Sequence, residues 1–260
     1  MVESYLGGKQ QRSSTHVQPA VTCFEDQVAL GVEEGADLIL LTGDNLNFPS
    51  PRAVAHMVSV LEGSGIPFMY ISGNHDWDMH AQPGPPDERR AGWQSSVLAP
   101  LYDGRDPDAW TEVFGGVRLV AIDNSVNQIS PAQLEFFRQA TAADDLPVML
   151  LLHIPLFVPQ LKEAISSGPF SRRPMAEPEP AANGGLMGDP DAEEPNTQST
   201  MEFMTAVDGC ESLAAVLAGH IHTAQHHAIG KAAAVQYVSD AGAFGGYRLV
   251  DIVPQGSPRL

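Results

Sequence analysis

Basic residues are scarce in this sequence, which has 14 Lys and Arg against 32 Asp and Glu and a formal net charge of −18 at pH 7. Binding to nucleic acid or to an anionic membrane surface depends on basic patches that neutralise phosphate groups. The charge balance therefore argues against both kinds of partner. We expect much of the acidity to lie on a solvated face, and bound divalent cations would offset part of it.

Cysteine and long apolar runs are scarce as well. The two cysteines, Cys23 and Cys210, form no CxxC pair and no metal-ligand spacing. Buried free thiols are therefore favoured over a disulfide. No segment reaches the roughly 18 apolar residues of a membrane helix, and Met1 to Ser14 lacks the apolar region of a signal peptide. A cytoplasmic protein is the expectation.

Several common catalytic signatures are missing. No Gly-x-Ser-x-Gly turn is present to hold a serine nucleophile. Neither Gly7-Gly8-Lys9 nor Gly230-Lys231 completes a phosphate-binding loop, and no Gly-x-Gly-x-x-Gly follows a predicted strand. These absences argue against a serine hydrolase, a nucleotide-dependent kinase and a dehydrogenase.

What the sequence does contain is a series of apolar runs of strand length that stop abruptly at polar residues. These runs end in Gly43-Asp44, in Gly73-Asn74-His75-Asp76, in His153 and in Gly219-His220-Ile221-His222. In open α/β sheets, ligands and metals are usually held at the edge where the carboxyl ends of the strands lie. The pattern therefore predicts an α/β protein with its polar clusters gathered at one edge.

Local signals predict the elements between these clusters. Helices are expected from Cys23 to Glu34, from Ser50-Pro51 to Gly63-Ser64-Gly65, and from Ser130-Pro131-Ala132-Gln133 onward. The strands on either side of the second helix should lie parallel as a βαβ unit. Residues 110–122 are typical of a hairpin with a glycine turn.

Three stretches show little pattern. We expect Met1 to Ser14 to be frayed and Gln82 to Asp108 to be a loop over the site. The proline-rich, acidic passage from Gln160 to Thr200 should be mobile. A tolerated surface insertion is favoured there over a lid that gates substrate. Regular structure resumes with a helix from Thr200 to Val207 and late strands at 213–217, 234–238 and 248–253.

The residue types in the polar clusters indicate metal chemistry. His, Asp and Asn offer nitrogen and oxygen donors to divalent metals, and the flanking glycines let the backbone turn sharply beside an ion. Alternation along an extended segment would put His220 and His222 on one side. Asp123-Asn124-Ser125 ends a further strand, and lining the cleft and remaining outside it are equally open for this segment.

The four clusters, in this order, resemble the motifs of the calcineurin-like metallophosphoesterase superfamily. The resemblance extends from His16 to about Val253 and implies a four-layer α/β/β/α sandwich of two mixed sheets. It also implies a single domain over residues 16–260, with an insertion at about 160–200 and an atypical or disordered segment at 1–15.

The resemblance further implies a role for each motif residue. Asp44 would bridge two metal ions, and Asn74, His153 and His220 would complete one of the two sites. His222 would belong to the other site together with His16. His75 would face the substrate, and Asp76 would orient the ring of His75. The metals are left open among Mn, Fe and Zn.

The first motif departs from the family pattern, because Ser14-Thr15-His16 stands where Asp-x-His is expected. A serine hydroxyl is a poorer ligand than a carboxylate, so one well-occupied metal and one weak or empty position are predicted. The resemblance implies hydrolysis of a small phosphomonoester or phosphodiester by metal-activated water. A catalytically impaired relative that acts as a binding or regulatory protein is the alternative.

Overall fold

The computed structural model describes residues 2–7, 19–78, 84–161, 175, 196–232 and 234–253. The helices, including two short 3-10 turns, are α1 (Ala20–Glu33), α2 (Pro51–Ser64), η1 (Asn74–Asp76), α3 (Pro86–Gln94), α4 (Ala99–Tyr102), α5 (Pro131–Thr141), α7 (Gln198–Gly209) and η2 (Gly242–Phe244). The strands are β1 (Val2–Gly7), β2 (Ile39–Leu41), β3 (Phe68–Tyr70), β4 (Ala109–Phe114), β5 (Val117–Ile122), β6 (Val148–Leu151), β7 (Leu213–Ala218), β8 (Gln225–Ile229), β9 (Ala234–Val238) and β10 (Tyr247–Ile252).

A mixed sheet of six strands forms the centre of the molecule, in the order β4-β5-β6-β7-β9-β8. Its inner strands β5, β6, β7 and β9 are mutually parallel, and the outer strands β4 and β8 are antiparallel to their neighbours. Because the inner strands run in one direction, the residues that follow them meet at a single edge of the sheet.

Two smaller pairings complete the strand arrangement. β2 and β3 are parallel, as the predicted βαβ unit requires, with Ile39 opposite Phe68. β1 pairs antiparallel with β10, with Val2 opposite Ile252. The expectation that Met1 to Ser14 is frayed is therefore wrong for Val2–Gly7, where pairing with a distant strand overrides a weak local pattern. Residues 8–18 lie outside the described residues.

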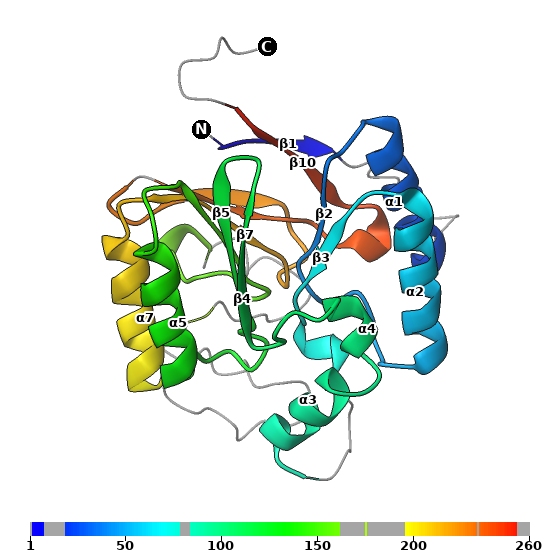
Figure 1. Cartoon of the computed structure of the whole chain (residues 1–260), viewed down its shortest axis with the longest axis horizontal. Coiled ribbons are helices and arrows are strands. Elements are labelled where there is room, and N and C mark those ends of the chain that lie inside the picture. Colours follow the sequence, from blue (N-terminus) through cyan, green and yellow to red (C-terminus); the bar gives the residue numbers. More distant parts are fainter. Residues whose placement is uncertain are drawn as a thin grey trace.

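Three buried clusters divide the molecule into four layers. One cluster fills the space between the six-stranded sheet and α5 and α7, and includes Phe137 and Phe203. A second lies between the sheets and joins Ile71 to Leu119 and Leu151. A third covers the outer side of β2 and β3 with residues of α1, α2 and α4. Figure 1 shows the same order, with α5 and α7 on one flank and α1 and α2 on the other. The predicted α/β/β/α layers are confirmed, although only the six-stranded sheet is mixed and the other described strands form the separate pairs β2-β3 and β1-β10.

The predicted helix starts are formed by the expected local contacts. Ser50 accepts a hydrogen bond from the backbone N–H of Ala53 at 3.1 Å, and Pro51 occupies the first turn of α2. At α5, Ser130 and Gln133 exchange the two hydrogen bonds of a capping box, at 3.2 Å and 2.9 Å. These contacts join residues three apart, which explains why the sequence alone predicts them.

Two regions differ from the predictions. The loop predicted over Gln82 to Asp108 contains α3 and α4. The sequence of α3 has no clear apolar stripe. Much of its attachment comes from polar groups, because Arg90 and Gln94 both contact Asp123. The antiparallel edge strand β8 was not predicted, because its Gln225-His226-His227 start is polar and partly exposed. Most of the passage from Gln160 to Thr200 lies outside the described residues.

Both cysteines are free thiols, as predicted, although only Cys23 is fully buried. Among the residues that the structure describes, none of the helices combines the length and apolar character needed to cross a membrane.

Candidate metal centre

The site lies where the ends of β2 and β3 meet the ends of β6 and β7. Asp44 follows β2 by way of Thr42 and Gly43, and Gly43 and Asp44 have left-handed backbone conformations with φ of 86° and 53°. This sharp turn presents the Asp44 carboxylate to the edge of the six-stranded sheet. The predicted delivery of a carboxylate to the sheet edge is therefore observed.

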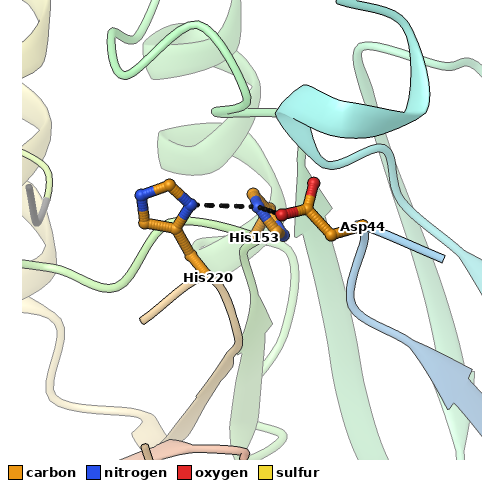
Figure 2. Close-up of side chains that lie close together, drawn as sticks. All are labelled: Asp44, His153 and His220. Atoms are coloured by element: carbon orange, nitrogen blue, oxygen red, sulfur yellow. Dashed lines mark hydrogen bonds and ion pairs between the residues drawn. The ribbon is translucent and has the colours of Figure 1, made fainter. Parts of the chain in front are cut away.

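The ring of His153 is the centre of the site, and its Nε2 atom has three close neighbours. Asp44 Oδ2 lies 3.2 Å away, Asn74 Oδ1 3.2 Å and His220 Nδ1 3.3 Å. Figure 2 shows Asp44, His153 and His220 converging from separate segments of the chain. Their ligand atoms all lie within 4.8 Å of one another.

A hydrogen bond on the opposite side of the ring sets the tautomer of His153. Its Nδ1 atom lies 2.8 Å from the backbone carbonyl oxygen of Thr42, which can only accept. Nδ1 therefore carries the proton, and in the neutral ring Nε2 presents a lone pair to the site. A metal-binding histidine is oriented in the same way, by a hydrogen bond at its other nitrogen.

The close contact between Asp44 and His153 shifts the pKa of both side chains. Burial alone would lower the pKa of His153, but the charge and hydrogen bond of Asp44 outweigh it, so the pKa of His153 is raised. Burial alone would likewise raise the pKa of Asp44, yet the neighbouring histidines, His153 above all, hold it well below the usual carboxyl range. Positive charge is thus favoured at this position, whether as a proton or as a cation.

Two glycines allow the loops to approach one another. A Cβ atom on Gly43 would lie 2.5 Å from the backbone N of Gly73 and 2.6 Å from Nδ1 of His153. A Cβ atom on Gly73 would lie 2.2 Å from Oδ1 of Asp44. The glycines predicted to let the backbone pass close to the ligands are therefore sterically required at both places.

Asp76 is fully buried and holds these loops together through the backbone. Its carboxylate accepts hydrogen bonds from the N–H groups of Asp44 at 2.9 Å, Leu46 at 2.8 Å and Gly73 at 2.8 Å. Burial and the nearby Asp44 charge raise the pKa of Asp76 to about 7. The sequence predicts that Asp76 orients the ring of His75. This role stays a prediction, and the hydrogen bonds above show that Asp76 also accepts from backbone groups of both loops.

His75 is partly exposed and lies beside the donor cluster. Its backbone N–H donates to Oδ1 of Asp44 at 2.9 Å, which joins the two motifs directly. Because the bond is made by the backbone, it does not consume either ring nitrogen. The predicted assignment of His75 to the substrate rather than to a metal stays a prediction.

The Gly-His-Ile-His motif differs in conformation from the extended segment that we predicted. His220 and His222 both have left-handed backbone conformations, with φ of 67° and 52°. Only His220 belongs to the group with Asp44 and His153. Alternation along a strand therefore does not explain how these two histidines are placed. His16, the predicted partner of His222, lies outside the described residues.

The donor set fits a divalent metal ion. An imidazole nitrogen with a free lone pair, a carboxylate, an amide oxygen and a second imidazole lie around one point. Hard and borderline divalent cations favour such mixed nitrogen and oxygen donors. A cation there would also relieve the mutual repulsion of the lone pairs. Asp44, Asn74, His153 and His220 are thus candidate ligands of one ion.

Comparison with known proteins agrees with this geometry. The family model described as calcineurin-like phosphoesterase matches residues 19–224, which include all of these ligands. The chain belongs to this family. A protein of known structure, a dimetal phosphatase from Danio rerio, has a similar fold, with a TM-score of 0.54, 13% identity and coverage of 86% of this chain and 78% of that one.

Two curated relatives of this calcineurin-like phosphoesterase are named probable cyclic nucleotide phosphodiesterases. The relative from Psychrobacter arcticus is 26% identical over 166 residues, which cover 58% of this chain and 55% of that protein. The relative from Psychrobacter sp. is 26% identical over 207 residues, covering 75% and 49%. The chain thus spans about half the length of the curated relatives that it matches.

Proposed function

We propose that this chain hydrolyses a phosphomonoester or phosphodiester bond with water activated by divalent cations. The observation that carries the proposal is the convergence of Asp44, Asn74 and His220 on the Nε2 atom of His153. Membership of the calcineurin-like phosphoesterase family supports it.

The ligands would be divided between two metal sites, as the family resemblance implies. One ion would be held by Asn74, His153 and His220. The other ion would be held by His222 and His16, and Asp44 would bind both ions. Bound divalent cations would offset the charge of a phosphate group and acidify water enough to provide a nucleophile near neutral pH. The mixed donor set suits Mn, Fe or Zn.

The residues of the chain would provide orientation and proton transfer. The Nδ1 hydrogen bond to Thr42 holds the His153 ring, and Asp76 holds the two ligand loops by their backbone. His75 would donate a proton to the leaving oxygen, or stabilise charge on the phosphoryl group. The partial exposure of His75 and its place beside Asp44 suit either role.

A small phosphodiester is the first substrate class to test. Both curated relatives carry the name probable cyclic nucleotide phosphodiesterase. The net charge of −18 is unsuited to a large polyanion, so a compact substrate with a single phosphoryl group is favoured.

The test is turnover of aryl phosphate monoesters, aryl phosphate diesters and cyclic AMP with added Mn²⁺. We expect Asp44→Asn to lose both activity and Mn²⁺ binding, and His75→Ala to lose activity while it still binds Mn²⁺. His226→Ala is the matched control, because His226 is an exposed histidine on β8. Turnover that survives both of the first two substitutions would refute the proposal.

The alternative, a binding or regulatory protein with an impaired site, has a specific basis in Ser14. This serine, which lies outside the described residues, replaces the carboxylate of the first family motif. One well-occupied and one weak metal position are expected, and Ser14→Asp should raise the Mn²⁺ content of the purified protein. Equal occupancy of two sites in both proteins would contradict this expectation.

A further inference from the structure

Asn124 is a fully buried amide at the end of β5, one strand away from the metal ligand His153. Its Oδ1 atom accepts hydrogen bonds from the backbone N–H groups of His153 and Ile154, both at 3.0 Å. Its Nδ2 atom donates to the carbonyl oxygen of Ile154 at 2.7 Å. One side chain thus satisfies three backbone groups where the chain leaves β6.

His153 is held at every polar backbone and ring atom that faces away from the metal site. Asn124 binds its N–H group, Gly219 donates to its carbonyl oxygen at 3.0 Å, and Thr42 accepts from its Nδ1. The contact with Gly219 also ties His153 to the segment that carries His220. The direction of Nε2 therefore depends on the backbone that Asn124 holds.

Asn124 is itself held by the residues on either side of it. Ser125 accepts a hydrogen bond from Nε1 of the buried Trp77 at 2.8 Å, just after the Asn74 to Asp76 motif. Asp123 accepts from Gln94 of α3 at 2.6 Å. The segment Asp123-Asn124-Ser125 is nearly inaccessible to solvent, so it lies behind the site rather than lining a cleft.

Asp123 also explains how the polar helix α3 is attached. Arg90 of α3 lies 3.3 Å from Oδ2 of Asp123, and the Arg90 side chain is only 14% exposed. An ion pair and an amide thus add to the apolar contact that Trp93 of α3 makes with the core. The same segment therefore joins α3, the Trp77 loop and the His153 backbone.

From these contacts we infer that Asn124 is a positioning residue for the metal ligand His153. It touches neither metal nor substrate, and it acts by fixing the backbone from which the His153 ring projects. The inference rests on the proposed function only in that His153 binds a cation. Outer residues that orient a metal-binding histidine typically change metal affinity by about 10- to 100-fold when they are replaced.

The experiment is Mn²⁺ binding measured by titration calorimetry, with folding checked by circular dichroism. We expect Asn124→Ala to bind Mn²⁺ about 10- to 100-fold more weakly than the wild type. Asn124→Asp retains an acceptor for both N–H groups and should recover most of the affinity. If Asn124→Ala does not fold, Asn124→Ser takes its place, because a smaller polar side chain leaves room for a water molecule beside the backbone groups. The same loss of Mn²⁺ affinity, about 10- to 100-fold, is expected for it.

Gln236 of β9 provides a matched control. It is a fully buried amide that accepts from the N–H of Leu156 at 2.8 Å and donates to its carbonyl oxygen at 3.0 Å. It therefore makes the same kind of clamp on the same segment, three residues beyond His153. Gln236→Ala should lose stability but bind Mn²⁺ within about twofold of the wild type, since most of the outer-shell effect depends on contact with the ligand.

Each outcome separates the positioning role from the function. Unchanged Mn²⁺ affinity in the folded Asn124 variants, or an equal loss in Gln236→Ala, would overturn the role of Asn124 and leave the proposed function intact. A wild type that binds Mn²⁺ but hydrolyses no phosphoester would overturn the function alone. A wild type that binds no Mn²⁺ would overturn both.

Discussion

Replacement of Gly73 by alanine isolates the close approach of the two ligand loops from other properties of the site. The backbone of Gly73 has φ of −99°, which any residue adopts, so the substitution introduces no conformational strain of its own. The added Cβ atom would lie 2.2 Å from Oδ1 of Asp44, 2.3 Å from its backbone N and 2.7 Å from Cε1 of His153. The effect should therefore be purely steric.

The size of the effect follows from these distances. Ordinary contacts of a Cβ atom begin at 3.4 Å, and the nearest backbone atom, the N of Asp44, would lie at 2.3 Å, so the loops would have to separate by about 1.1 Å. The Asp44 side chain could rotate away from the added Cβ atom, but this backbone atom and the buried ring of His153 could not. We expect the upper end of the overpacking range, about 3 kcal/mol. For a chain of this length that is a fall in melting temperature of roughly 6–12 °C.

The assay combines thermal unfolding of the metal-free protein with Mn²⁺ titration. Separation of the loops would also displace Asp44 from His153, so Mn²⁺ affinity should fall by at least about tenfold. Gly63→Ala is the control, because Gly63 is an exposed residue of α2 whose added Cβ atom would meet nothing within 4 Å. It should be more stable than the wild type by about 0.5–1 kcal/mol. A Gly73→Ala variant that keeps both melting temperature and Mn²⁺ affinity would refute the reasoning.

Other predictions concern pH, a helix cap and metal removal. Burial raises the pKa of Asp123, and the charge of Arg90 offsets only part of this effect. The stability that this raised pKa provides is fully present below about pH 3.8 and is lost as the pH rises through the raised value, because the native state binds the proton more tightly than the unfolded state. The test is urea unfolding at several pH values between about pH 4 and pH 7. As the pH rises, the free energy of unfolding of Asp123→Asn should increase relative to that of the wild type. A difference that is constant with pH would contradict this. Ser130→Ala removes the cap on the N–H of Gln133 and should cost about 1 kcal/mol in the free energy of unfolding without a change in Mn²⁺ affinity; an unchanged free energy would show that the cap is unimportant. Mn²⁺ at about 100 times its dissociation constant should stabilise the wild type by about 2.7 kcal/mol, a chelator should reverse the shift, and Asp44→Asn should show none; an equal shift in Asp44→Asn would place the ion elsewhere.

Local sequence patterns predicted most of the elements. The caps at Ser50 and Ser130, the end of α2 at Gly63-Ser64-Gly65 and the hairpin between β4 and β5 all depend on residues close together in the chain. Their hydrogen bonds join residues that are close in the sequence, so propensity and spacing are sufficient to predict them. The four motifs were found in the same way, as clusters that end apolar runs, whereas the sandwich was predicted from the resemblance of these motifs to those of the family.

Where the predictions were wrong, distant contacts determine the structure. The pairing of Val2–Gly7 with β10 joins the two ends of the described chain. Helix α3 is attached through Arg90 to Asp123, so its local apolar pattern is weak. The hydrogen bonds of Asp76 to the backbone of Asp44, Leu46 and Gly73 were not predicted either, because backbone partners leave no trace in residue type.

By itself, the sequence determined which residues are available as ligands, in what order, and that each follows a strand. Only the tertiary structure decided which atoms meet: Thr42 and His153 are 111 residues apart, and their hydrogen bond selects the nitrogen that faces the site. Tertiary structure also determines the left-handed turns at His220 and His222. The same is true of the hydrogen bond between Asn124 and the backbone of His153. The physical reason is that strand ends are local features, whereas the direction of a lone pair depends on how two sheets pack against each other.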